Sequence, residues 1–222
     1  MLQMKIYRFS KKKGEKETVM NNILEKIKAG NVLTIAGRAC MGKTVLGINI
    51  ATRLAETKKV LYVYTESKLP VDSLEFKFDF INVSTISDIM CAILKNEYDD
   101  VIIDSFLYMR NHKLEDTAYM LKTIAQELDV AVVVQAHIPR KCDLRKDKRP
   151  KYSDIKYKKM CGYLYKYSDR VVFLYRDYYY FPEKDDIMEF VEYDKCFFRK
   201  RHIIERIPFK FLMDKAYEPP EK

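Results

Sequence analysis

The sequence lacks any long apolar run and any sign of a secretion signal. No hydrophobic stretch in its 222 residues approaches the roughly 18 residues that a membrane-spanning helix needs. Residues 1–17 are polar, without the apolar core of a signal peptide. The five cysteines are scattered, and no C-x-x-C pair suggests a zinc site or a redox couple. We therefore expect a cytoplasmic protein without membrane contacts, whose thiols are mostly buried or inert.

Short apolar runs alternate with amphipathic segments along most of the chain. This alternation predicts an α/β fold, with a parallel sheet and helices on both of its faces. The expected strands are 32–36, 60–65, 101–104 and 130–136, and the expected helices are 17–28, 43–56, 84–94 and 115–128. Three further strands, at 170–175, 187–193 and 203–211, are joined by short polar turns and indicate an antiparallel extension.

The segment from Gly37 to Thr44 reads G-x-x-x-x-G-K-T and lies between a predicted strand and a predicted helix. This order aims backbone N–H groups and a helix N-terminus at one point, where a polyphosphate can bind. Lys43, in solvent-facing space, would reach the phosphates as a catalytic residue, and the Thr44 hydroxyl would bind Mg²⁺. The alternative is a chance match in a glycine loop. The predicted nucleotide-binding residues are Gly37, Arg38, Ala39, Cys40, Met41, Gly42, Lys43, Thr44 and Val45.

Polar residues follow three other predicted strands. Asp104 ends the strand 101–104, where an acidic residue could bind Mg²⁺. The alternative is that Asp104 is a helix N-cap. Glu66 fits a general base for the attacking water, provided that its strand neighbours the first one; otherwise it is a solvent-facing loop carboxylate. His137 fits a catalytic residue that senses the γ-phosphate, although a lone histidine is usually structural.

Most of the net charge of +9 lies in one segment, residues 139–170, which contains twelve basic and four acidic residues. Tyrosines at 152, 157, 163, 165 and 167 are interleaved with these charges, which suits phosphate contact and base stacking on a single-stranded nucleic acid. The alternative is a solvated lysine-rich loop whose tyrosines pack inward. The predicted DNA-binding residues are Arg140, Lys141, Arg145, Lys146, Lys148, Arg149 and Lys151.

Several segments resemble, in the same order, the motifs of the DnaB-type replicative helicases, which are RecA-like ring motors. Residues 32–51 are similar to the first motif, 64–67 to the segment with the catalytic glutamate, and 102–107 to the Walker B strand. Residues 148–155 resemble a K-R-P-x-x-S-D-L stretch near the DNA-facing loops, and 168–177 resemble the strand after it. His137 is more similar to the phage helicase–primase and mitochondrial Twinkle branch than to bacterial members, which carry glutamine there.

The resemblance implies a RecA-like P-loop NTPase core, with a mostly parallel sheet flanked by helices and an antiparallel C-terminal extension. We divide the chain into an N-terminal arm and helix (1–28), a RecA-like ATPase domain (29–216) and a tail (217–222). The resemblance also implies ATP and Mg²⁺ as cofactors, and single-stranded DNA as a partner. The expected assembly is a homo-oligomer, with a hexameric ring as one form, and the expected activity is a DNA-stimulated, helicase-like ATPase.

The resemblance fails at the late K-x-R motif, whose arginine acts on the neighbouring subunit in the family. Here the matching residues are Lys195, Cys196 and Phe197, so that arginine is missing. Lys195, with Arg199 or Arg201 after a shift in register, is a candidate trans-acting group. An arginine finger contributes about 10³ to 10⁵ in turnover. A second hypothesis therefore stays open: a non-motor ATP-binding DNA adaptor or helicase loader with negligible turnover.

Overall fold

The computed structural model describes residues 20–66, 76–110, 113–151, 153–154, 159–193 and 201–216, without the side chains of 159–161, 193, 201–205, 211 and 214–216. In this part of the chain one eight-stranded sheet has the order β3-β2-β4-β5-β1-β6-β7-β8. Neighbours from β3 to β6 pair in parallel, and β7 and β8 continue the sheet antiparallel. The strands are β1 (Val32–Gly37), β2 (Val60–Tyr64), β3 (Asp79–Asn82), β4 (Asp100–Asp104), β5 (Ala131–His137), β6 (Arg170–Arg176), β7 (Ile187–Tyr193) and β8 (Arg201–Pro208).

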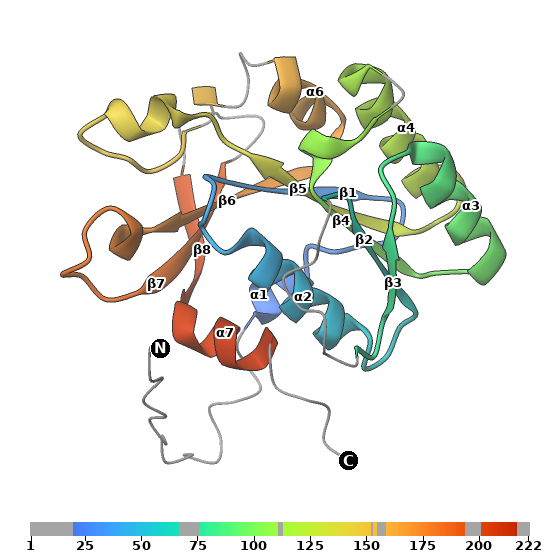
Figure 1. The fold of residues 1–222 in the computed structure, drawn as a ribbon, viewed down its shortest axis with the longest axis horizontal. Helices are drawn as coiled ribbons and strands as arrows, with labels where there is room; N and C mark the ends of the chain where they lie inside the picture. Colours follow the sequence, from blue (N-terminus) through green and yellow to red (C-terminus); the bar gives the residue numbers. More distant parts are fainter. Residues whose placement is uncertain are drawn as a thin grey trace.

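Helices cover both faces of this sheet (Figure 1). One face carries α1 (Asn21–Leu24), α2 (Lys43–Leu54) and α7 (Phe209–Ala216), and the other carries α3 (Ile86–Asn96), α4 (Leu114–Glu127) and α6 (Lys159–Tyr167). Short 3₁₀ helices follow three strands: η1 (Phe106–Tyr108), η2 (Arg140–Leu144) and η3 (Asp177–Tyr179). None of the helices seen in the described ranges is long and apolar enough to cross a bilayer.

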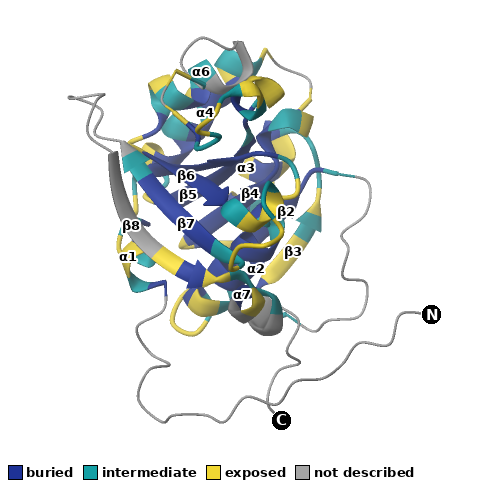
Figure 2. Ribbon diagram, turned by 90° about the vertical axis from the view of Figure 1, so that its left-hand side faces the viewer, coloured by how far each residue is buried: buried dark blue, intermediate teal, exposed yellow. Residues whose placement is uncertain are grey.

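The core consists of two apolar layers, one on each face of the sheet, and the central strands are buried throughout (Figure 2). Every residue of β1, β2 and β4 is buried. Strands buried on both faces require continuous apolar runs rather than alternation, which is the pattern that the sequence shows. The predicted α/β class, the mostly parallel sheet and the antiparallel extension are confirmed.

Four details differ from the predictions. The first helix is described as α1 alone, since the chain after Leu24 tightens into i→i+3 hydrogen bonds instead of continuing to residue 28. The edge strand β3 was not predicted, because its residues are mostly exposed and form no apolar run. Helix α6 was not predicted, because its many lysines and tyrosines obscure the apolar pattern. Its Leu164 packs in the core. The last strand ends at Pro208, which has no N–H for a ladder, and α7 follows where a strand was expected to continue.

The three described cysteines differ in burial. Cys142 is buried, whereas Cys40 and Cys91 are exposed. Residue 196 and the side chain of 161 lie outside the description.

Candidate nucleotide-binding site

The predicted phosphate loop connects the end of β1 to the start of α2, at the carboxyl ends of the parallel strands. Cys40 and Gly42 have φ angles of 60° and 87°, in the left-handed region. At Gly42 space is also restricted, since a Cβ atom would lie 2.3 Å from the Phe209 ring of α7. Both the left-handed backbone conformation and the close packing at this position therefore require glycine.

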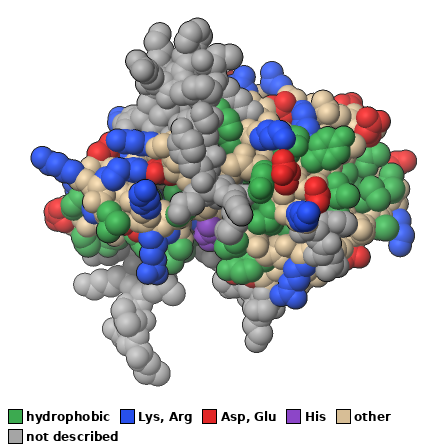
Figure 3. Space-filling view, turned by 90° about the horizontal axis from the view of Figure 1, so that it is seen from above, with side chains coloured by type: hydrophobic (Ala, Val, Ile, Leu, Met, Phe, Trp, Pro, Cys, Tyr) green, Lys and Arg blue, Asp and Glu red, His purple; other side chains and the backbone are tan. Residues whose placement is uncertain are grey.

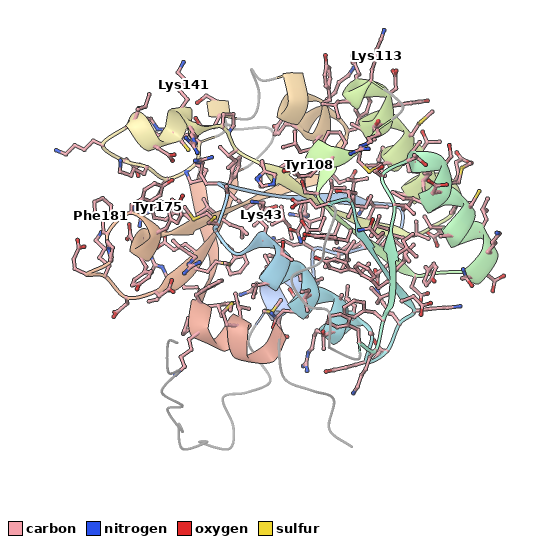
Figure 4. All side chains as sticks on the ribbon, in the orientation of Figure 1. Lys43, Tyr108, Lys113, Lys141, Tyr175 and Phe181 are labelled. Carbon is pink, nitrogen blue, oxygen red and sulfur yellow. The ribbon has the colours of Figure 1, made fainter. Side chains whose placement is uncertain are left out.

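Lys43 lies in the centre of the site at the start of α2 (Figure 4). Its ammonium donates to the carbonyl oxygens of Gly37 at 3.2 Å and Arg38 at 2.8 Å. The side chain is buried, so the expectation that it faces solvent is wrong. Burial lowers the pKa of Lys43 to about 8, against the opposing charge of Asp104. A desolvated cation of this kind is stabilised when an anion binds beside it.

Asp104 ends β4, and its carboxylate is buried beside the start of α2. It accepts a hydrogen bond from the Tyr62 hydroxyl at 3.0 Å from Oδ2, and the Thr44 side chain lies close enough to act on it. Burial raises the pKa of Asp104, while Thr44, Tyr62 and the Lys43 charge act in the opposite direction. The N-cap of the following η1 is Ser105, so the carboxylate is not a helix cap. The hydroxyl and carboxylate predicted to bind Mg²⁺ thus lie side by side.

Glu66 lies two residues after the end of β2, but the stated condition for its role is wrong. In the sheet order β4 and β5 separate β2 from β1, so the two strands are not neighbours. Glu66 nevertheless comes close enough for Asp104 and Lys43 to influence it. Burial and the Asp104 charge raise the pKa of Glu66, against the opposing influence of Lys43 and Tyr64. A raised pKa makes the carboxylate a stronger base.

His137 ends β5 and pairs in register with Gly37, the first residue of the phosphate loop. Burial lowers the pKa of His137 to about 4, and the nearby cations Lys43 and Arg38 contribute to this shift. The imidazole is therefore neutral at pH 7 and offers one N–H donor and one acceptor. This leaves it suited to a hydrogen bond with a phosphate oxygen, rather than to a charged contact.

The residues gathered here fit a Mg²⁺–nucleotide complex. Mg²⁺ is usually held by one or two carboxylates together with substrate phosphates, and not by an all-protein cage. The described residues contain no group of three or more His, Cys, Asp and Glu side chains that could hold a metal ion. Asp104 and Thr44 would provide the oxygen ligands, and Lys43 the cation for the phosphates.

Arg38, the second residue of the loop, was predicted to contact nucleotide. In the structure its side chain binds Asp143 of η2. Its guanidinium donates to both carboxylate oxygens of Asp143, at 3.1 and 3.0 Å from Nε, and to the carbonyl of Ile138 at 3.0 Å. The Tyr180 hydroxyl donates to the same carboxylate at 2.5 Å. No local pattern signals this contact, because its partners lie 105 positions apart.

The predicted DNA-binding residues divide into two groups. Arg140, Lys141, Lys146 and Lys151 are exposed, and Lys141 extends away from the body of the molecule (Figure 4). Lys and Arg side chains stand out on this part of the surface (Figure 3). Leu144, which is 87% exposed, lies among them. These four cations are positioned to meet a partner in solution.

The other three, Arg145, Lys148 and Arg149, bind to the protein itself. Arg145 donates to both oxygens of Asp154, at 2.5 and 2.8 Å. Lys148 donates to the carbonyl of Asp143 at 2.7 Å. Arg149 contacts Glu189 at 3.0 Å and Asp177 at 3.3 Å, and stacks over the Tyr175 ring at 4.5 Å. Arg149 thus holds the segment against β6 and β7, while Arg145 and Lys148 bind within the segment.

The remaining predictions for this region are only partly visible. Tyr163, Tyr165 and Tyr167 pack against the core from α6, as the inward-packing alternative proposed. The tyrosines at 152 and 157 lie outside the described residues. The same is true of the trans-acting candidates Lys195 and Arg199 and of Phe197, whereas Arg201 begins β8 with its side chain not described.

A family model of the DnaB-like helicase C terminal domain matches residues 79–207, more than half of the chain. The chain belongs to this family. Because the match begins after the phosphate loop, the assignment of that loop rests on its motif and geometry.

Curated relatives in this DnaB-like family include the replicative DNA helicase DnaB of Buchnera aphidicola subsp. Baizongia pistaciae. It is 23% identical over 221 residues, covering 75% of this chain and 47% of the relative. The replicative DNA helicase DnaC of Bacillus subtilis is 38% identical over 77 residues, covering 35% of this chain and 16% of the relative. The chain thus spans less than half the length of these relatives.

Two solved structures share the fold. One, described as an ATPase domain, has a TM-score of 0.68 at 20% identity and covers 83% of this chain and 84% of that chain. The other, a DnaB-like replicative helicase described with its interactions with primase, has a TM-score of 0.65 at 19% identity, covering 82% and 55%. The RecA-like fold implied by the resemblance is confirmed.

Proposed function

We propose that this DnaB-like domain binds ATP and Mg²⁺ and hydrolyses the nucleotide, with single-stranded DNA as its stimulating partner. The proximity of Thr44 to the Asp104 carboxylate carries the proposal. It brings the end of the phosphate loop beside the end of a separate buried strand, and places together two oxygen ligands of the kind that Mg²⁺ takes.

Each residue of the site then has a distinct task. Lys43 binds the β- and γ-phosphates, and Thr44 and Asp104 hold the metal ion directly or through water. Glu66 takes the proton from the attacking water, for which its raised pKa is favourable. His137 donates a hydrogen bond to the γ-phosphate and loses this contact after hydrolysis. Bound Mg²⁺ supplies neutralisation of charge on the transferred phosphoryl group.

DNA contact is assigned to the exposed cations of the basic segment, namely Arg140, Lys141, Lys146 and Lys151. Backbone phosphates attract such side chains independently of base sequence. The segment is linked to the phosphate loop through Arg38 and Asp143, so the two proposed sites share one ion pair. Residues 29–216 would form the working domain, assembled as a homo-oligomer.

The missing arginine at position 197 favours a second candidate function. A protein without a trans-acting cation would bind ATP but turn it over very slowly. Such a chain would act as an ATP-dependent DNA adaptor or helicase loader. Turnover therefore separates the two candidates, whereas nucleotide binding is common to both.

The test is ATP affinity and steady-state ATPase activity, each measured with and without single-stranded DNA. Lys43→Ala should abolish nucleotide binding or turnover while the protein stays folded; Lys95→Ala, which removes an exposed lysine of α3, serves as the matched control. Strong stimulation of the wild type by DNA supports the motor, and binding with negligible turnover supports the adaptor. Unchanged ATP affinity and turnover in Lys43→Ala would exclude both.

A further inference from the structure

Tyr62 lies in the middle of β2, on the sheet face that α2 covers. Its side chain is completely buried, and its ring packs against Phe78 and Phe80 at centroid distances of 5.6 and 6.2 Å. In register Tyr62 lies beside Ile102, so its hydroxyl reaches two residues along β4 to donate to Asp104 Oδ2 at 3.0 Å. The packing of the ring fixes where the hydroxyl can be.

The space for this tyrosine depends on Gly47 of α2. A Cβ atom at Gly47 would lie 2.9 Å from the Tyr62 hydroxyl oxygen and 2.1 Å from the amide nitrogen of Gln135. Any other residue would therefore force both side chains to shift. The helix approaches the sheet closely at the point where the hydroxyl meets the carboxylate, and the tyrosine is held from both sides.

We propose that Tyr62 is a positioning residue for metal binding: its hydroxyl fixes the rotation of the Asp104 carboxylate beside Thr44. This inference rests on the proposed function, because it assumes that Asp104 and Thr44 hold the metal ion. A carboxylate that is already oriented loses no rotational freedom when it binds a cation. Partners of this kind, which touch a metal ligand but not the metal, typically change metal affinity by about 10- to 100-fold.

Tyr98 provides a matched control within the same sheet. It is a buried tyrosine that precedes β4, and its hydroxyl donates to Asp79 Oδ2 at 2.7 Å. Tyr98→Phe therefore removes an equivalent tyrosine–aspartate hydrogen bond at the opposite end of β4 from Asp104. A general loss of stability would affect both variants, whereas a positioning role belongs to Tyr62 alone.

The experiment measures Mn²⁺ binding by electron paramagnetic resonance in the presence of a non-hydrolysable ATP analogue, for wild type, Tyr62→Phe and Tyr98→Phe. Tyr62→Phe should raise the Mn²⁺ concentration for half-saturation by about 10- to 100-fold, and Tyr98→Phe should leave it unchanged. Affinity for the analogue in EDTA should stay the same in all three proteins. Equal half-saturation in the two variants overturns the inference.

A double-mutant cycle keeps the result specific to the carboxylate. In an Asp104→Asn background, Tyr62→Phe should have no further effect on Mn²⁺ half-saturation, because the group it positions is gone. A further loss of the same size in that background shows that Tyr62 acts by another route and overturns the inference. If the wild type binds the analogue but with no dependence on metal, both the metal site and this inference fail. If it does not bind the analogue at all, the proposed function itself fails.

Discussion

At the scale of single residues, the site is distinguished by a buried ammonium group whose hydrogen-bond partners among the described residues are neutral carbonyls. Lys43 donates to two loop carbonyls, and the nearest carboxylates act on it through their charge. Loop carbonyls compensate only part of the lost hydration, which explains the lowered pKa. A phosphate group would supply the missing counter-charge.

This gives a pH prediction with opposite signs for stability and for binding. Lys43 has a pKa of about 8 in the folded protein and 10.5 as its unperturbed value, so the unfolded chain binds more protons in this window. The Lys43 contribution to stability without ligand should therefore rise as pH increases from about 8 to 10.5. Nucleotide affinity should fall over the same range, by up to about tenfold per pH unit, because binding requires the charged form.

Calorimetry in buffers of different ionisation enthalpy can measure this proton uptake directly. The wild type should take up part of a proton on binding ATP near pH 9 and much less at pH 7. Lys43→Arg is the control, since arginine stays protonated throughout and should show no such uptake from this position. Identical proton uptake in the two proteins would show that protonation of Lys43 is not coupled to nucleotide binding.

Motif residues of the site could be predicted from the sequence, but their surroundings could not. Thr44 and Asp104 follow from a loop motif and from the end of an apolar run, which are local signals. The contact of Arg38 with Asp143 depends on how β5 leads into η2, and nothing near Arg38 in the chain reveals it. The burial of Lys43 likewise depends on packing from several elements.

At the scale of elements, the same distinction explains which strands and helices were predicted. β1, β4 and β5 are buried on both faces and therefore read as continuous apolar runs. β3 lies at an exposed edge, and α6 carries several lysines and tyrosines, so neither has a clear apolar pattern. The order of strands in the sheet could not be derived from local pattern, which is why the assumed neighbourhood of β1 and β2 was wrong.

The basic segment offers a prediction at this scale, because its cations fall into two structural groups. Lys141→Ala or Lys146→Ala should weaken single-stranded DNA binding on all sequences alike. The slope of log affinity against log salt should flatten by about 0.7 per lost contact. Thermal stability should not change, since both side chains are exposed. Lys113→Ala, an exposed lysine before α4 and far from Lys141 in Figure 4, is the control.

Arg145→Ala should behave differently. It leaves the Asp154 carboxylate, whose side chain is 8% exposed, without its bidentate partner. We expect a loss of about 1–3 kcal/mol in the free energy of unfolding, the usual cost of an unsatisfied group of this kind. If both exposed lysine variants keep the wild-type slope, the segment is a solvated loop and DNA contacts must be sought elsewhere.

At the scale of the whole molecule, the open question is whether one subunit completes the active site of another. The described residues around Asp104 and Lys43 include Arg38, but its guanidinium is committed to Asp143. A ring of RecA-like subunits would need a cation delivered across the interface, and Phe197 cannot provide one. Arg199 and Arg201 are the nearest arginines in the chain to the missing position.

The last prediction tests these two arginines together with assembly. If one of them acts in trans, its replacement by alanine should nearly abolish DNA-stimulated turnover while ATP affinity survives. Mixing that variant with wild type should then reduce activity by more than the mutant fraction, because each mutant subunit disables a neighbour's site. If neither acts, wild-type turnover should be very slow, and Phe197→Arg should raise it.

Sizing chromatography with nucleotide shows whether an oligomer is present in each case. Strong wild-type turnover that persists after loss of both arginines would contradict both versions and would place the required cation elsewhere, or remove the need for a shared site.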